Sequence, residues 1–280
     1  MILSEINIYP IKSCHGIQLE DAVVEQRGLR FDRRWVIVDA EGNFLTQREW
    51  PRMARVKVAV AGDGLDVSAN GSGARRIEPL AEGPRVATRV WERAGDSIAY
   101  DAETNEWFSD ALGMAVELRY MPDDAGRPVK PVGSDESDRT GFADAYPLLL
   151  ANETSMADLN SRMPEPLPVN RFRPNIVVAG ADAWAEDNWA KIRVGDAVFR
   201  VAKPSDRCVM TTVDQAVGVS GGKEPLRTLA TFRMSKDLFP ERFGSWGLPA
   251  NSVLFGENLI PDTTGVRIGV GDEVEVLEYR

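Results

Sequence analysis

Histidine and cysteine are scarce in this chain of 280 residues, which contains one histidine and two cysteines. An iron–sulfur cluster held by thiolates needs about four cysteines, and a structural zinc site needs about four cysteine or histidine ligands. Cys14, His15 and Cys208 cannot supply either set. Two cysteines far apart in the sequence also make a poor disulfide framework, so a reducing, cytoplasmic location is expected.

Long apolar runs, an excess of basic residues and nucleotide-binding motifs are lacking as well. No run approaches the roughly 20 apolar residues that span a bilayer, and the chain opens on a strand-like segment rather than a secretory signal, so no membrane partner is expected. The formal net charge of −10 argues against broad nucleic-acid binding. Neither G-x-G-x-x-G nor G-x-x-x-x-G-K-[ST] occurs, so any redox chemistry would need electrons from another molecule.

Short segments of alternating apolar residues dominate the chain and predict a mainly β protein with some α-helix. Residues 1–100 alternate like strands, beginning with Ile2–Ile8. One helix is predicted over Asp101–Leu112, and a second over Ser155–Met163 with a Ser155-x-x-Asp158 capping box. Helices are therefore expected to be few and short.

Three further segments carry predictions about architecture. Residues 192–201 and 268–276 both place Gly-Asp between short apolar runs, which predicts two strand–turn–strand units and favours a barrel. The polar segment 121–141 is rich in Pro, Gly and Asp and predicts a long loop, the best candidate for a lid. The acidic run at Glu186 and Asp187 is interpreted as a solvated loop.

Cys208 is the residue most suggestive of chemistry. A thiol acts as a nucleophile or metal ligand only as thiolate, which neighbouring cations favour. Lys203 and Arg207 supply such cations, while Asp206 opposes them. The alternative is a small buried hydrophobe, the usual role of a free cysteine. The local sequence leaves both interpretations open.

Four segments place cationic or polar residues beside strand-like sequence. They are Tyr9–Cys14, Asp32–Trp35, Asn170–Asn175 and Lys203–Asp214. Charged groups at strand ends are commonly just solvated, so each segment alone predicts little. Together the four could form one pocket that offers cations to a phosphate and a thiolate to a soft metal.

An ordered set of short motifs extends this pattern over nearly the whole chain. The motifs are Tyr9-Pro10-x-Lys12-Ser13, Gly28-Leu29-Arg30, Asp32-Arg33-x-Trp35, Ala157–Arg162, Phe172–Asn175, Ser205-x-Arg207-Cys208, Thr211–Asp214, Lys223–Leu226 and Phe255-Gly256. In order and spacing they resemble the MOSC-domain proteins that also carry an N-terminal MOSC β-barrel domain. That group includes the mitochondrial amidoxime-reducing components and the bacterial YcbX proteins.

The resemblance implies a fold and a domain organisation. A β-barrel-like MOSC N-terminal domain would occupy residues 1–120. A C-terminal MOSC β-barrel with a few short helices would occupy residues 121–280. The first strands, with Lys12 and Arg33, would contribute to a cofactor cleft shared by the two domains.

The resemblance also implies a cofactor and a set of site residues. The cofactor would be the molybdenum cofactor, with Cys208 as the catalytic residue and metal ligand. Its pterin and phosphate would be held by Lys12, Ser13, Arg33 and Arg173, and Tyr146, Asp206 and Arg207 would lie against it. The chemistry of these residue types agrees, because a thiolate suits a soft metal and paired cations suit a phosphate.

The activity implied is two-electron reduction of small N-hydroxylated compounds such as amidoximes, hydroxylamines and N-hydroxylated bases. Electrons would come from a separate ferredoxin-like or cytochrome-like protein with its reductase. The acidic chain would then need a local basic face for docking of an acidic donor. Two alternatives are a cofactor or sulfur carrier that uses Cys208 without reductive turnover, and a β-barrel binding protein with a structural Cys208. Pyridoxal phosphate is disfavoured because no lysine is evident for a Schiff base.

The chain departs from the pattern of these relatives in two respects. Ser205 stands where relatives commonly have a second cysteine, which is not the metal ligand, so cofactor binding is expected to survive. The chain also ends at Arg280 without the ferredoxin domain of the YcbX type, and it lacks the membrane anchor of the amidoxime-reducing components. The sequence is therefore interpreted as a free-standing soluble form.

Overall fold

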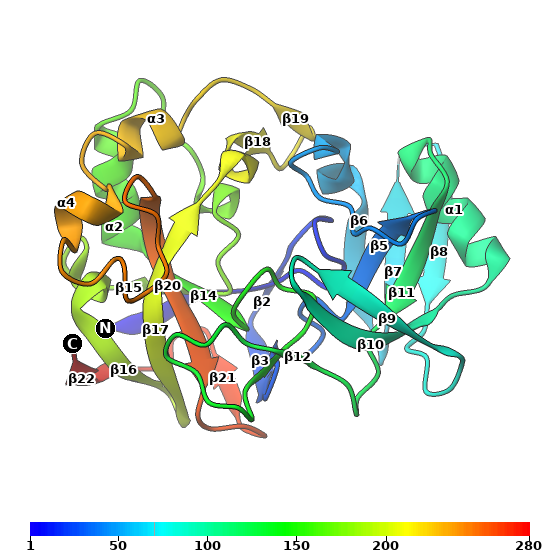
Figure 1. The fold of residues 1–280 in the computed structure, drawn as a ribbon, viewed down its shortest axis with the longest axis horizontal. Helices are drawn as coiled ribbons and strands as arrows, with labels where there is room; N and C mark the ends of the chain where they lie inside the picture. Colours follow the sequence, from blue (N-terminus) through cyan, green and yellow to red (C-terminus); the bar gives the residue numbers. More distant parts are fainter. Residues whose placement is uncertain (70) are drawn as a thin grey trace.

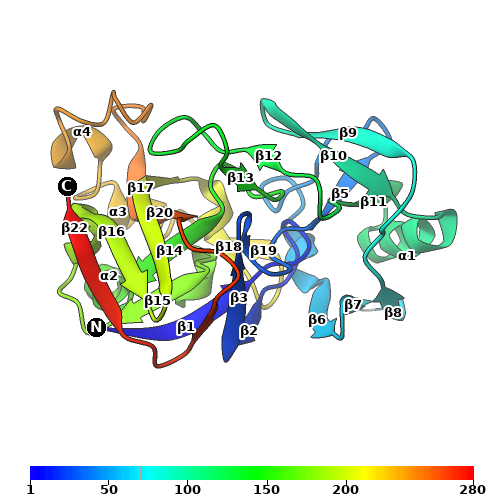
Figure 2. The same cartoon turned by 90° about the horizontal axis from the view of Figure 1, so that it is seen from below.

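The computed structural model describes residues 1–69 and 71–280 and shows two lobes side by side (Figure 1). The barrel lobe comprises residues 1–34 and 148–280, the small lobe comprises residues 35–120, and a linker of residues 121–147 runs between them. Both termini lie at the end of the barrel lobe that is remote from the small lobe (Figures 1 and 2). Mainly β structure, as the sequence predicts, is confirmed.

An eight-stranded sheet forms the barrel lobe, in the order β2-β1-β15-β14-β20-β17-β16-β22. A bridge between Ile2 and Glu273, with a hydrogen bond from Leu3 N to Asp272 O, joins the β22 edge back to β1. The sheet therefore curls round on itself. Its strands are β1 (Ile2–Ile8), β2 (Ile17–Leu19), β14 (Leu148–Asn152), β15 (Ile176–Ala179), β16 (Trp189–Val194), β17 (Ala197–Arg207), β20 (Val253–Pro261) and β22 (Val274–Tyr279).

The barrel core takes side chains from both ends of the sequence. Leu3, Ile6 and Ile8 of β1 pack with Leu150 of β14 and Phe199 of β17. The register of β1 against β15 shifts between residues 3 and 5, which lets both odd- and even-numbered side chains of β1 reach this core. The barrel therefore cannot be completed by the C-terminal half of the chain alone.

The small lobe contains two sheets and one long helix around a second core. One sheet has the order β5-β11-β10-β9 and the other has the order β6-β7-β8. The strands are β5 (Trp35–Asp39), β6 (Lys57–Ala61), β7 (Gly64–Ala69), β8 (Gly73–Ile77), β9 (Arg85–Val90), β10 (Arg93–Ala99) and β11 (Val116–Tyr120). Helix α1 (Ala102–Leu112) confirms the predicted helix: the Asp101 side chain accepts a hydrogen bond from Thr104 N, and Gly113 ends the helix at a φ of 62°.

Minor elements fill the remaining chain. Strands β3 (Asp21–Glu25), β4 (Gly28–Leu29) and β21 (Arg267–Gly269) make a three-stranded sheet, and β12 (Arg127–Pro128) pairs with β13 (Arg139–Thr140) in the linker. Strands β18 (Val213–Asp214) and β19 (Val219–Ser220) form a short ribbon, and α3 (Leu226–Leu229) and α4 (Ser235–Leu238) are single turns. Within the described residues, no helix combines the length and apolarity needed to cross a membrane.

Three local predictions are corrected by the structure. Helix α2 (Glu153–Ser161) begins at an Asn152 cap, because the Ser155 hydroxyl is used elsewhere, bonding Glu186 and Trp184. Glu186 and its neighbour Asp187 are buried rather than solvated, and Asp187 makes a two-pronged ion pair with Arg233. The second Gly-Asp segment is no hairpin, since β21 pairs with β3 and β22 pairs with β16.

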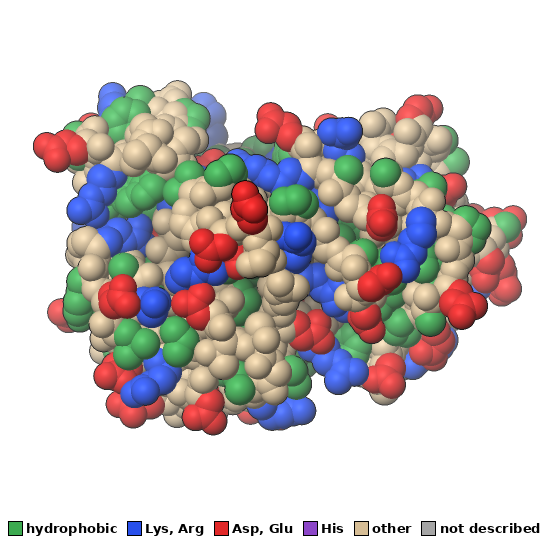
Figure 3. Space-filling model, turned by 60° about the horizontal axis from the view of Figure 1, so that its bottom comes forward, with side chains coloured by type: hydrophobic (Ala, Val, Ile, Leu, Met, Phe, Trp, Pro, Cys, Tyr) green, Lys and Arg blue, Asp and Glu red, His purple; other side chains and the backbone are tan. Residues whose placement is uncertain are grey.

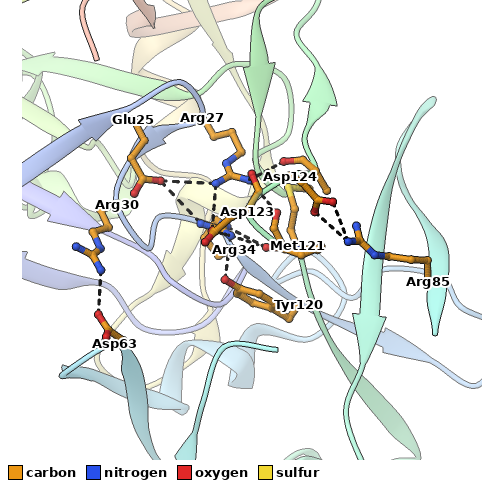
Figure 4. Close-up of polar contacts among 12 residues, drawn as sticks. Glu25, Arg27, Arg30, Arg34, Asp63, Arg85, Tyr120, Met121, Asp123 and Asp124 are labelled. Carbon is orange, nitrogen blue, oxygen red and sulfur yellow. Dashed lines mark hydrogen bonds and ion pairs between the residues drawn. The ribbon is translucent and has the colours of Figure 1, made fainter. Parts of the chain in front are cut away.

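Arginines tie the two lobes and the linker together (Figure 4). Arg27 donates to the carbonyl oxygens of Pro122, Asp123 and Ala125, and Arg30 bonds Asp63 of the small lobe. Most of these contacts run between segments that are distant in sequence. They hold the two lobes and the linker in one arrangement.

Candidate functional site

A cavity of about 400 Å³ lies where the barrel lobe, the small lobe and the linker meet. The structure brings all eight predicted site residues to its wall: Lys12, Ser13, Arg33, Tyr146, Arg173, Asp206, Arg207 and Cys208. They come from the loop after β1, the turn before β5, the end of the linker, the turn before β15 and the end of β17 with the residue that follows it. Folding therefore gathers residues that are up to about two hundred positions apart.

Lys12 is held at the wall by the linker. The loop after β1 is fixed by a hydrogen bond from Lys12 N to Trp35 O. The ammonium group donates to Phe142 O at 2.9 Å and pairs with Asp144. Burial lowers the pKa of Lys12 to about 8, although Asp144 favours the charged form. A lysine whose charge is only partly compensated is well suited to accept an anion.

Left-handed backbone conformation is concentrated at this cavity. Six non-glycine residues among those described have a positive, left-handed φ. Four of the six line the cavity: Ser13 (65°), Arg33 (48°), Trp91 (57°) and Arg173 (57°). Such conformations are costly for residues with a Cβ and gather at functional sites. The backbone around the cavity therefore adopts conformations that these residue types normally avoid.

Arg33 and Arg173 share one aromatic support. Their guanidinium carbons lie 4.4 and 4.0 Å from the centre of the Tyr9 ring. Arg33 is paired with Asp32, but among the described residues Arg173 makes no salt bridge and donates to Gln215 at 3.1 Å. Burial lowers the pKa of Arg173 to about 10. Arg173 is thus a buried cation without a carboxylate partner, rather than a solvated strand end.

Arg207 uses both terminal nitrogens in hydrogen bonds. Nη1 donates to Ser205 Oγ at 2.9 Å and Nη2 to Phe172 O at 2.7 Å, whereas Nε is buried and has no partner among the described residues. Burial lowers the pKa of Arg207. Ser205 thus supplies an oxygen acceptor to this guanidinium group.

Cys208 directly follows β17 and precedes a short 3-10 turn, with its side chain partly exposed. Arg48 Nε donates to its Sγ at 3.3 Å, and Arg48 Nη2 donates to Asp144 at 2.8 Å. Arg48 Nη1 is buried without a partner. Sequence reasoning missed both Arg48 and Asp144, because nothing in their spacing connects them with Cys208 or Lys12.

Tyr146 and Asp206 contribute in different ways. Tyr146 lines the cavity, and its hydroxyl donates to Val132 O at 2.9 Å, so the linker holds the phenol in place. Burial raises the pKa of Tyr146. Asp206 is exposed, and its carboxylate lies 3.6 Å from Lys203. The wall therefore combines a fixed aromatic surface with a solvated carboxylate.

The cavity is strongly basic although the chain is acidic. Among the described residues that line it, lysines and arginines number eight and carboxylates three. On the face shown in Figure 3, Lys and Arg side chains lie along the middle, where the lobes meet, and Asp and Glu side chains are spread over both lobes. Arg48 Nη1 and Arg207 Nε add two buried donors that have no hydrogen-bond partner among the described residues. This donor set fits a ligand that carries phosphate or another multiple negative charge.

The arrangement of metal ligands is equally informative. In the part of the chain that the structure describes, no three His, Cys, Asp or Glu side chains are grouped to hold a metal ion. Cys208 could therefore contribute one soft ligand, and the remaining ligands would have to come from a bound molecule. A metal carried by a sulfur-bearing, phosphate-bearing organic cofactor fits these residues.

A larger cavity of about 700 Å³ lies on the junction around Arg27 and Arg34 (Figure 4). Its guanidinium groups are already occupied by carbonyl oxygens and by Asp123, and Arg85 pairs with Asp124 nearby. No thiol lines it within the described residues. We therefore take the smaller cavity, in which cations outnumber carboxylates, as the candidate site.

Comparisons with known proteins identify two families that match this chain. Residues 1–115 match the family described as the MOSC N-terminal beta barrel domain, and residues 137–275 match the MOSC domain. The mitochondrial amidoxime-reducing component 1 of Xenopus laevis is 33% identical over 98% of this chain and 81% of the relative. The human protein of that name is 31% identical, over 98% of this chain and 82% of its own length.

A second kind of relative matches part of a longer protein. A molybdenum cofactor sulfurase of Oryza sativa subsp. japonica is 33% identical over 84% of this chain, and the match covers 31% of that protein. The family matches together span both lobes, and the amidoxime-reducing components match nearly the whole chain. The chain therefore belongs to the family of MOSC-domain proteins that carry an N-terminal MOSC beta barrel domain.

Proposed function

We propose that this protein is a molybdenum-cofactor-dependent reductase of small N-hydroxylated compounds, such as amidoximes and hydroxylamines. The observation that carries the proposal is the position of Cys208, a partly exposed thiol in a cavity whose wall is rich in cations and, among the described residues, offers no other set of metal ligands. The amidoxime-reducing components among the relatives favour this reaction class.

Each part of the wall has a role in this proposal. Cys208 Sγ would be the protein ligand of the metal, and the Lys12, Arg33 and Arg173 cations with Ser13 would hold the pterin and its phosphate. Arg207 and the Tyr146 ring would lie against the cofactor. When bound, the cofactor supplies two-electron redox chemistry, which no side chain of this chain provides.

The network around Asp144 would keep the site in order. Asp144 is shared by Lys12 and Arg48, and these cations hold its pKa well below the usual range. The carboxylate is therefore ionised at physiological pH and orients both cations. Arg48 in turn directs Nε at Cys208 Sγ, so one cation links the carboxylate to the thiol.

The proposed reaction also needs a partner. Reduction of an N–OH group to N–H consumes two electrons and two protons and releases water. We infer that a separate electron-transfer protein, ferredoxin-like or cytochrome-like, delivers the electrons. Because the chain carries a net charge of −10, docking of an acidic donor would have to use basic surface such as that visible in Figure 3.

Turnover of benzamidoxime with an artificial electron donor tests the proposal. Protein produced with an intact cofactor pathway is expected to convert benzamidoxime to benzamidine. Cys208→Ser is expected to abolish turnover, because a hydroxyl is a harder and less readily ionised ligand than a thiol. The matched control is Cys14→Ser, which alters a buried cysteine outside the cavity wall and is expected to stay active.

The same experiment separates reduction from the carrier alternative, which the sulfurase relative favours. A carrier would hold cofactor or a persulfide at Cys208 yet show no turnover. Full activity in Cys208→Ser would contradict the role of Cys208 in either function.

A further inference from the structure

One hairpin of the small lobe ends at the cavity. Strands β9 and β10 are paired up to Val90 and Arg93, so Trp91 and Glu92 form a two-residue turn. Trp91, Glu92 and Arg93 all line the cavity that contains Cys208. The turn therefore brings three side chains from the small lobe to a site built mostly from the barrel lobe and the linker.

Trp91 occupies a turn position that favours glycine. Its φ is 57°, and in two-residue hairpin turns a positive φ at the first central residue is typical of glycine, asparagine or aspartate. A bulky side chain in this conformation is an outlier that persists only where its surroundings support it. The sequence thus retains a tryptophan where folding alone would favour a smaller residue.

The Trp91 side chain is also unusually exposed. It is 48% exposed, whereas Trp35 and Trp189 are almost completely buried. Two contacts hold it in place: Phe44 packs edge-on at 5.2 Å between ring centres, and the Arg48 guanidinium lies 5.0 Å from the ring centre. These contacts leave much of the indole surface free for a ligand.

The support beneath Trp91 leads directly to the candidate reaction centre. Arg48, which contacts the indole ring, also donates to Cys208 Sγ at 3.3 Å. One side chain therefore separates the exposed ring from the thiol. A flat exposed ring at this place offers stacking energy to a planar group whose reactive atom points toward Cys208.

We propose that Trp91 is a substrate platform that selects N-hydroxylated compounds with an aromatic or otherwise planar conjugated group. This inference rests on the proposed function, which it extends to the class of substrate. Trp91 would bind the planar part of the substrate and leave the N–OH group to the cavity. Small aliphatic N-hydroxylated compounds would gain little from the ring.

The test compares Trp91→Gly with Trp91→Phe on two substrates, benzamidoxime and acetamidoxime. Glycine suits the positive φ, so this variant is expected to fold, and phenylalanine retains a stacking surface. The ratio of kcat/KM for benzamidoxime to that for acetamidoxime is expected to fall roughly threefold to tenfold in Trp91→Gly, mainly through KM. In Trp91→Phe most of the ratio is expected to be retained.

Binding without turnover supplies a second readout. In the absence of an electron donor, calorimetry is expected to show that benzamidoxime binds cofactor-loaded Trp91→Gly more weakly than cofactor-loaded wild type. The dissociation constant is expected to rise by roughly threefold to tenfold. Molybdenum and pterin contents are measured in the same samples. Normal contents together with weaker binding would support the platform.

The outcomes distinguish this inference from the proposed function. If wild type reduces both substrates and the ratio is unchanged in Trp91→Gly, the platform is overturned while the reductase stands. Loss of pterin in Trp91→Gly would make Trp91 a cofactor contact and would also overturn the platform. If wild type binds benzamidoxime through Trp91 but never reduces it, the platform stands and the proposed reaction fails.

Discussion

The two cysteines of this chain occupy opposite environments. Cys14 is completely buried, and burial raises its pKa to about 12. Cys208 is partly exposed beside the Arg48 guanidinium. We therefore expect one fast-reacting thiol per native chain when the cofactor-free protein is treated with iodoacetamide. Peptide mapping should place the label on Cys208, and rapid labelling of Cys14 would contradict the described environments.

Arg173 is expected to lower the stability of the cofactor-free protein and to strengthen cofactor binding. It is a buried cation without a salt bridge among the described residues, so replacement by an apolar side chain of similar length removes a desolvation cost. Arg173→Met should therefore melt at the same temperature as the cofactor-free wild type or higher, while its pterin content falls several-fold. Thermal unfolding and pterin analysis of the same preparation measure both effects. A large loss of stability with normal pterin content would make Arg173 structural.

Residues with their own sequence context could be found before the structure, and others could not. The segments that contain Lys12, Arg173 and Cys208 are recognisable because a motif surrounds each of them. Arg48 and Trp91 have no such signal: their importance comes from contacts between lobes and from a left-handed turn. Side-chain pairing across a long sequence separation is invisible to local patterns.

Strand β20 carries a buried carboxyl group, Glu257, that makes stability depend on pH. Glu257 is completely buried, and burial raises its pKa to about 8 even though Arg280 lies 2.7 Å away. In the unfolded chain this carboxyl titrates near its ordinary value, so between about pH 4.5 and pH 8 the folded state binds more protons. This group therefore contributes stability that is lost as pH rises through that window.

Glu257→Gln tests this assignment, because glutamine keeps the shape and cannot ionise. With one histidine in the chain, few other groups titrate between pH 5 and pH 8. Denaturant unfolding at pH 5.5 and pH 8 is expected to show a smaller loss of stability in the variant than in wild type. Equal losses in the two proteins would contradict the raised pKa.

Elements with explicit end signals were predictable, and elements defined by distant partners were not. Helix α1 has an Asp101 cap and a Gly113 end, and both work as the sequence indicates. Residues 16–25 alternate like one strand, yet in the structure they form the two strands β2 and β3, since β2 pairs with β1 whereas β3 pairs with β4 and β21. Tertiary pairing decides such divisions, and no local periodicity records it.

The whole molecule depends on both ends of its chain. Strand β1 pairs with β15, and the barrel core includes Leu3, Ile6 and Ile8 from β1. Residues 121–280 expressed alone are therefore expected to lack a cooperative thermal transition, because one wall of the core is absent. Calorimetry of this fragment beside the full chain measures the effect. A sharp transition near that of the full chain would show that the barrel closes without β1.

The same interdependence explains where the site lies. The first strands belong to the barrel sheet, the following residues build the small lobe, and the linker returns to the barrel past Asp144. The cavity forms where the barrel lobe, the small lobe and the linker meet, so its charged side chains come from segments that share no local sequence pattern. A resemblance over the whole chain therefore predicts more about this site than composition does.

Molybdenum and pterin analysis of protein purified from cells with an intact cofactor pathway is the sharpest test of the proposed cofactor site. Wild-type protein is expected to contain about one molybdenum and one pterin per chain, with normal contents in Cys14→Ser and strongly reduced molybdenum in a folded Cys208→Ser variant. Wild-type protein free of both, or a Cys208→Ser variant with full molybdenum content, would contradict the assignment of this cavity as a cofactor site anchored by Cys208.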